Sequence, residues 1–122
     1  MWHAILPVTV QVFLIKDNQV FLIKRANTGF MDGKWFGAAW RLDENEKIID
    51  GAIRETKEEI WVEIKEKDLS KPLVMHFKDE NWKIRISFFF SCKQFIGKPK
   101  NSEPEKASEA EWFSIDSLPE EM

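Results

Sequence analysis

Residues 46–61 read EKIIDGAIRETKEEIW, and this segment holds the strongest helical pattern in the chain. Apolar or small side chains recur there every three or four residues, at Ile49, Ala52, Ile53, Thr56 and Ile60. That spacing places them on one side of an α-helix. We therefore predict an amphipathic helix over residues 48–60, with Asp43 or Asn45 capping the approach to it.

The predicted helix also carries an acidic face. Glu55, Glu58 and Glu59 fall within one arc of it, because successive residues turn by about 100°, and this arc lies away from the apolar stripe. Like charges at such spacings destabilise a helix by about 0.2 to 0.5 kcal/mol per pair, and Arg54 relieves only part of that repulsion. Carboxylate oxygens are ligands suited to Mg²⁺ or Mn²⁺. The pattern indicates a divalent-cation site, and the alternative interpretation is an acidic face that contacts only solvent.

Two segments before the helix predict a β-hairpin. Residues 8–15 and 20–23 are rich in β-branched and aromatic side chains, and the turn-forming triplet Lys16-Asp17-Asn18 separates them. The residues that follow, 26–34, include two glycines and few apolar side chains. They predict a loop, and loops of this kind usually line a site.

Three segments after the helix predict further strands, at residues 73–77, 84–92 and 111–113. The second of them is apolar on both faces around its three phenylalanines, so we expect it at the centre of a sheet. Strands on both sides of one strong helix favour an α+β (mixed α/β) fold in which the helix packs on a sheet. Residues 1–122 are expected to form one domain, which is long enough to bury a sizeable core.

The composition restricts the functions open to the chain. It has 122 residues with 18 Lys and Arg against 21 Asp and Glu, a net charge of -3, so it lacks the basic surface of a duplex nucleic-acid binder. Its single cysteine, Cys92, excludes an internal disulfide and a cysteine-rich zinc site, which suits the cytoplasm. The N-terminal apolar run is too short and too polar to span a membrane. The expected partners are therefore small molecules.

Together with Glu46, the acidic helix resembles the signature box of the Nudix hydrolases. The family pattern is G-x5-E-x7-R-E-U-x-E-E-x-G-U, where U is aliphatic, and this chain matches its charged positions at Glu46, Arg54, Glu55, Glu58 and Glu59. The segment 27–35 resembles the loop that enters the box. Residues 103–106, 112–113 and 118–119 resemble the C-terminal part of family members that hydrolyse nucleoside triphosphates. The resemblance covers nearly the whole chain.

The resemblance implies an α/β/α sandwich with a mixed sheet and a strand-loop-helix box that binds Mg²⁺ or Mn²⁺. It also implies cleavage of a nucleoside triphosphate or another nucleoside diphosphate derivative by attack of water on phosphorus. Glu55, Glu58 and Glu59 match the metal-binding carboxylates, one of which also acts as or assists the general base, and we assign that catalytic role to Glu58. Arg54 and Glu46 match the catalytic pair that braces the box. Homodimers are common among similar proteins.

Two glycines of the family pattern are replaced by tryptophans in this chain, at Trp40 and Trp61. Glycine permits left-handed backbone and close approach to a ligand, so tryptophan at either position is a large change. Two interpretations follow. In the first, the protein is a working hydrolase with an unusual loop. In the second, a loop rebuilt by drift or by engineering has made the scaffold a non-catalytic binder of an aromatic or apolar small molecule.

The aromatic composition favours an apolar pocket. Six tryptophans and ten phenylalanines occur without any tyrosine, so few ring hydroxyl groups need buried partners. Glu103 and Glu105 lie in the C-terminal loop that resembles the family segment near the metal, which makes either of them a candidate oxygen ligand as well. Trp61 is expected to help line or fill the pocket. The candidate substrate-binding residues are Phe30, Phe36, Trp40, His76 and Glu103.

Overall fold

The computed structural model describes residues 5–29, 31–79 and 81–122. Strands β1 (Val8–Lys16) and β2 (Gln19–Arg25) form the predicted hairpin. Its turn residues, Asp17 and Asn18, both adopt positive φ, at 52° and 60°. Two-residue turns of this type match the twist of the strands they join. The hairpin prediction is confirmed, and β2 continues two residues past its predicted end.

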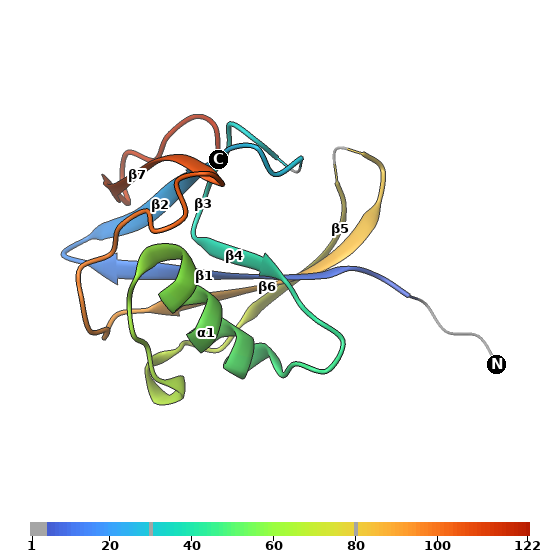
Figure 1. The fold of residues 1–122 in the computed structure, drawn as a ribbon, viewed down its shortest axis with the longest axis horizontal. Helices are drawn as coiled ribbons and strands as arrows, with labels where there is room; N and C mark the ends of the chain where they lie inside the picture. Colours follow the sequence, from blue (N-terminus) through green and yellow to red (C-terminus); the bar gives the residue numbers. More distant parts are fainter. Residues whose placement is uncertain (1–4, 30, 80) are drawn as a thin grey trace.

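The sheet is built around β1 (Figure 1). One edge of β1 pairs in parallel with β6 (Ile84–Cys92), and its other edge pairs antiparallel with β4 (Ala38–Arg41) and then with β2. Strand β5 (Leu73–Lys78) pairs with the far edge of β6. Strands β3 (Trp35–Phe36) and β7 (Ala107–Ser114) pair with β2. The fold is α+β with a mixed sheet, and β6 lies between two strands as predicted.

The main differences from the sequence prediction concern β3, β4 and β7. The pattern does not predict β3 and β4, because two and four residues are too few to show a period. Strand β7 begins at Ala107, four residues before the predicted start at Glu111. The first half of β7 carries exposed polar side chains. Among the described residues β7 pairs only with β2, so this part of the strand is half solvated.

The helix α1 (Ile48–Ile60) has the predicted bounds and covers one face of the sheet over β1 and β4 (Figure 1). The predicted capping by Asp43 or Asn45 is wrong. The N-cap residue is Lys47, which makes no side-chain capping hydrogen bond. The approach is held by the backbone instead, because the Glu46 N–H donates to the Asp43 carbonyl at 3.2 Å.

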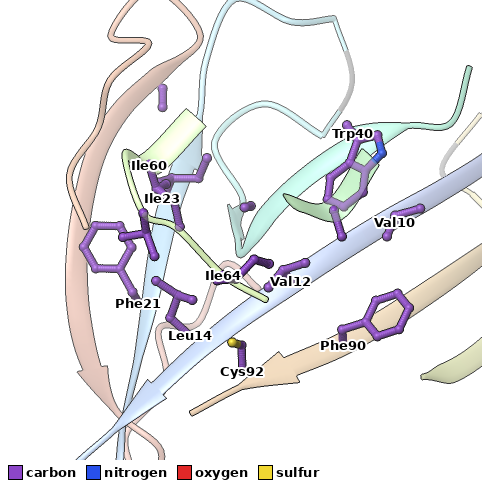
Figure 2. Packing of buried hydrophobic residues seen from close by; sticks show 14 residues of the cluster. Val10, Val12, Leu14, Phe21, Ile23, Trp40, Ile60, Ile64, Phe90 and Cys92 are labelled. Carbon is purple, nitrogen blue, oxygen red and sulfur yellow. The ribbon is translucent and has the colours of Figure 1, made fainter. Parts of the chain in front are cut away.

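The main core lies between α1 and the sheet (Figure 2). Alternate residues of β1, Val10, Val12 and Leu14, are fully buried and point to this side. Trp40 of β4 lies at one end of the cluster beside Val10, its partner in the strand register. Cys92 is buried in the same core, as expected of a small apolar side chain.

The opposite face of the sheet has no second α-helix in the part of the chain that the structure describes, so the expected outer helical layer is not seen there. A short 3₁₀ helix, η1 (Glu66–Asp68), lies between α1 and β5. An apolar groove lined by Phe13, Leu73, Met75, Phe89 and Leu118 occupies that face. No helix among the described residues is long and apolar enough to cross a membrane.

Candidate active site

Arg54 holds three of the acidic side chains singled out in the sequence. Its Nε and Nη2 both donate to Glu46 Oε2, at 3.1 and 2.6 Å. Its Nη1 donates to Glu55 Oε1 at 3.0 Å and to Glu58 Oε2 at 3.2 Å. The Glu46 hydrogen bonds are the largest cause that raises the pKa of Arg54. The predicted bracing pair is therefore present, and it positions two of the helix carboxylates.

The C-terminal loop is attached to the end of α1. The last carbonyls of a helix have no partner within it, and here they accept hydrogen bonds from loop residues. The Ser102 hydroxyl donates to the Glu58 carbonyl, the Ser102 N–H to the Glu59 carbonyl, and the Lys100 N–H to the Ile60 carbonyl. These bonds bring the next residue, Glu103, beside the acidic face.

Four carboxylates line one cavity of about 440 Å³, those of Asp43, Glu55, Glu59 and Glu103. Glu55 and Glu59 reach it from α1, and Glu103 reaches it from the attached loop. Burial is the main cause that raises the pKa of Glu59 to about 8, and the charges of Glu55 and Glu103 raise it further. Arg25, Arg41 and Lys106 also line the cavity and bring positive charge to it. Acidic and basic side chains therefore meet in this cavity.

The segment before the helix is anchored to the acidic site. Glu59 Oε2 accepts a hydrogen bond from the Ala39 N–H at 2.9 Å. Ala39 belongs to β4 and directly precedes Trp40. This bond ties the entrance of the box to the last turn of α1, so the strand, loop and helix form one unit around the cavity.

The carboxylates suit a divalent metal ion in their chemistry. Mg²⁺ prefers oxygen ligands and is commonly held by one or two carboxylates together with water and substrate phosphates. Glu55 and Glu59 offer such oxygens in a half-buried setting where their negative charges repel each other. Among the described residues, no three histidine, cysteine or acidic side chains already form a complete metal cage. Glu58 is more exposed, does not line the cavity and bonds Arg54 instead.

A second cavity of about 770 Å³ adjoins the acidic one. Phe36, Phe77 and Phe89 give it aromatic walls, and Gln11 and Ser87 place polar groups on its floor. The floor is the sheet face opposite α1, because Gln11 alternates with the buried core positions of β1. An aromatic cavity with a few polar groups is suited to a planar heterocyclic ring.

The two tryptophans at the glycine positions take very different places. Trp40 is 8% exposed, lines both cavities, and is not among the residues with positive φ. Trp61 ends α1 in the left-handed conformation, with φ of 64°, and is 58% exposed. Its ring lies beneath Lys100 Nζ, 5.1 Å from the ring centroid. Trp61 therefore lines neither cavity, and the expectation that it fills the pocket is wrong.

Of the remaining candidate substrate-binding residues, some line a cavity and others do not. Phe36 lines the aromatic cavity, and Glu103 lines the acidic one. His76 is exposed on β5 and lines neither, while its neighbour Phe77 does. Phe30 lies outside the described residues.

Sequence reasoning missed residues that distant segments bring to the site. Arg25, at the end of β2, lines both cavities. The pair Asp79 and Arg85 lines the aromatic cavity, where Arg85 Nε donates to Asp79 Oδ2 at 2.5 Å. This bond lowers the pKa of Asp79. The available signal for Arg25 was a cation between the predicted strand and the glycine-containing loop.

The fold and the site together define an α+β domain with an acidic strand-loop-helix box beside a ring-sized cavity. A family model described as the NUDIX domain matches residues 5–122. The chain belongs to the Nudix family, whose members are pyrophosphohydrolases of nucleotide derivatives. An 8-oxo-dGTP diphosphatase of Proteus vulgaris is 30% identical over 84 residues, covering 69% of this chain and 73% of the relative.

Solved structures agree on the fold. A MutT NUDIX hydrolase from Burkholderia pseudomallei superposes with a TM-score of 0.83 at 22% identity, covering 96% of this chain and 89% of that one. A MutT protein from Methanosarcina mazei superposes with a TM-score of 0.73 at 20% identity, covering 90% and 78%.

Proposed function

We propose that this chain is a metal-dependent pyrophosphohydrolase that cleaves a nucleoside triphosphate or a related nucleoside diphosphate derivative. The observation that carries the proposal is the meeting of Glu55, Glu59 and Glu103 in one cavity, next to a larger aromatic cavity. The first suits a metal ion and phosphates, and the second suits a base. The family model and the Proteus vulgaris relative do not support the alternative of a non-catalytic binder.

The proposed metal ligands are Glu55, Glu58 and Glu59, with Glu103 as a further oxygen donor. A divalent cation supplies two effects when bound: it screens the negative charge of the phosphates and lowers the pKa of its water ligand. Glu58 is included because it lies on the same helix face, and because Arg54 bonds both Glu55 and Glu58. Activity measured with each ion separately distinguishes Mg²⁺ from Mn²⁺.

The cations of the site are placed to hold a polyphosphate. Arg25 lines both cavities, and Lys106 lines the acidic one. A nucleotide whose base occupies the aromatic cavity would carry its phosphates past Arg25 toward the helix carboxylates. Arg54 keeps those carboxylates in place through Glu46. A carboxylate of the acidic helix face, which the family resemblance assigns as Glu58, then accepts the proton of the attacking water, which is general-base catalysis.

Substrate turnover tests the proposal directly. The protein is incubated with a panel of nucleoside triphosphates, including 8-oxo-dGTP, in Mg²⁺ or Mn²⁺, and released nucleoside monophosphate, pyrophosphate and phosphate are measured. We expect monophosphate and pyrophosphate, with a rate within the broad range of enzymes, about 1 to 1000 per second. Glu59→Gln should abolish the reaction. Glu66→Gln, which removes an exposed carboxylate of η1, is the matched control and should leave it intact.

The outcome that overturns the proposal is equally specific. If no nucleotide of the panel is cleaved with either metal, while a nucleotide or an aromatic compound still binds the folded protein, the chain is a binder on a Nudix scaffold. If Glu66→Gln lowers turnover as much as Glu59→Gln, the acidic cavity is not the reaction site.

A further inference from the structure

Gly51 stands in the first half of α1, where glycine is less favourable than alanine. Its surroundings give the reason. A Cβ at this position would lie 2.8 Å from Glu46 Oε1 and 3.0 Å from Trp40 Nε1. The two atoms therefore approach the same point above the helix, and the missing side chain leaves room for both.

Trp40 Nε1 and Glu46 Oε1 are complementary groups. Both are buried, and within residues 5–29, 31–79 and 81–122 neither has a hydrogen-bond partner. An indole N–H is only a donor, and a carboxylate oxygen is an acceptor. Buried polar groups are rarely left unpaired, because the loss of hydration is not recovered. A donor and an acceptor that share one pocket over a glycine can satisfy each other.

Glu46 connects this pocket to the acidic site. Its other oxygen, Oε2, accepts both hydrogen bonds from Arg54, at 3.1 and 2.6 Å. Arg54 in turn bonds Glu55 and Glu58. The position of Oε1 therefore fixes the plane of the Glu46 carboxylate. The orientation of that plane in turn fixes the orientation of the Arg54 guanidinium, which bonds the helix carboxylates.

We propose that Trp40 is a positioning residue whose indole N–H donates to Glu46 Oε1, directly or through one water molecule. The pair fixes the Glu46 carboxylate, which orients Arg54 and through it Glu55 and Glu58. Because residue 51 is a glycine, there is room for the Trp40 indole to lie beside Glu46 at the entrance of the box. The catalytic part of this inference rests on the proposed function, and the hydrogen bond itself does not.

The hydrogen bond is tested in the metal-free protein by its indole signals in proton–nitrogen NMR spectra. Trp40→Phe removes one signal and so identifies it. We expect that signal to exchange slowly with solvent, and to move in Glu46→Gln and in Gly51→Ala, whose Cβ separates the two groups. The exposed Trp61 and Trp82 supply reference signals that exchange fast. A Trp40 signal that exchanges as fast as theirs, or that stays in place in both variants, overturns the inference.

The positioning role is tested by Mn²⁺ binding and by kinetics. Trp40→Phe keeps the ring wall of the cavities and removes the donor. We expect it to weaken Mn²⁺ binding roughly threefold to tenfold, the effect of losing one hydrogen bond to a group outside the ligand set. The kcat should fall more at limiting Mn²⁺ than at saturating Mn²⁺. Trp112→Phe, a half-buried tryptophan outside the site, is the control for ring loss.

The outcomes separate the inference from the proposed function. Unchanged Mn²⁺ affinity in Trp40→Phe, or an equal loss in Trp112→Phe, overturns the positioning role. If Trp40→Phe does not fold, Gly51→Ala carries the same metal and NMR measurements. If the unmodified protein hydrolyses no nucleotide, the proposed function fails, while the NMR signal and the Mn²⁺ titration still decide whether Trp40 positions Glu46.

Discussion

Glu59 and Ala39 are joined by a hydrogen bond of 2.9 Å from the Ala39 N–H to the Glu59 carboxylate. The bond runs between the last turn of α1 and β4, so a side chain of the acidic face also fixes the backbone beside Trp40. A buried carboxylate that accepts only part of its possible hydrogen bonds, with Glu55 and Glu103 near it, keeps its proton more readily than a free one. The acidic cavity is thus arranged to gain from a bound cation.

Divalent metal is expected to raise the thermal stability of the protein. A ligand that binds only the native state stabilises it by about 2.7 kcal/mol at a hundredfold excess over its dissociation constant. Melting curves with and without millimolar Mg²⁺ or Mn²⁺ measure the effect. Glu58→Gln should remove most of the stabilisation, because it deletes a charged ligand while keeping the side-chain shape.

The matched comparison for that prediction is Glu66→Gln, which should respond to metal as the unmodified protein does. An unchanged melting midpoint in the unmodified protein would show that the acidic face only contacts solvent. A full metal response in Glu58→Gln, with loss of the response in Glu55→Gln and Glu59→Gln, would remove Glu58 from the ligand set and agree with its exposed position.

The metal-free protein should become less stable as the pH rises from about 4.5 to about 8. Glu59 has a pKa of about 8 in the folded state against 4.5 for an ordinary glutamate, so between these values the folded protein holds a proton that the unfolded chain has lost. Stability falls with pH wherever the native state binds more protons. The pKa of Glu55 is raised as well and acts in the same direction.

Urea unfolding in a chelating buffer at several pH values measures this trend, and Glu59→Gln should flatten it. The lowered pKa values of Asp32 and Asp79 act below their usual value of 3.8, outside this window. Mn²⁺ binding should strengthen over the same range, because the metal must displace the proton. A stability that rises from pH 5 to pH 8 in the metal-free protein would contradict the prediction.

Much of the fold is predictable because its signals are local. The helix pattern runs over thirteen residues and fixes the bounds of α1, and the turn at Asp17 and Asn18 fixes the first hairpin. Strands β3 and β4 owe their existence to pairing with β2 and β1, so their own residues carry no period. The helix cap failed as a prediction because backbone bonds replaced the side chains that the sequence offered.

The site likewise has a part that local sequence signals predict and a part that they do not. The helical spacing places Glu55, Glu58 and Glu59 on one face, and the family resemblance pairs Arg54 with Glu46. In the structure Arg54 bonds Glu46, Glu55 and Glu58. Arg25 and the Asp79 and Arg85 pair reach the cavities only through the pairing of strands far apart in the sequence. The direction of Trp61 depends on the left-handed end of α1, which turns its ring toward Lys100 and away from the site.

Trp61→Gly is expected to be more stable than Trp61→Ala by roughly 0.5 to 1 kcal/mol. Both variants lose the ring and its contact with Lys100, so the difference isolates the backbone. Alanine keeps the strain of a φ of 64° at the end of the helix, while glycine adopts it freely. Urea midpoints of the two variants measure the difference. Equal midpoints would mean that the left-handed conformation at residue 61 costs nothing.

Trp40→Gly should destabilise the protein by roughly 3 to 5 kcal/mol, the usual cost of removing a large buried side chain. The family pattern has glycine here, but the backbone of Trp40 needs no positive φ, so glycine relieves no strain. It removes a ring packed beside Val10 and adds chain freedom to the unfolded state. Urea unfolding of Trp40→Gly beside Trp40→Phe, which keeps most of the ring, measures the packing. If Trp40→Gly unfolds at the same urea concentration as the unmodified protein and hydrolyses nucleotides faster, the tryptophan obstructs the site and contributes nothing to its core.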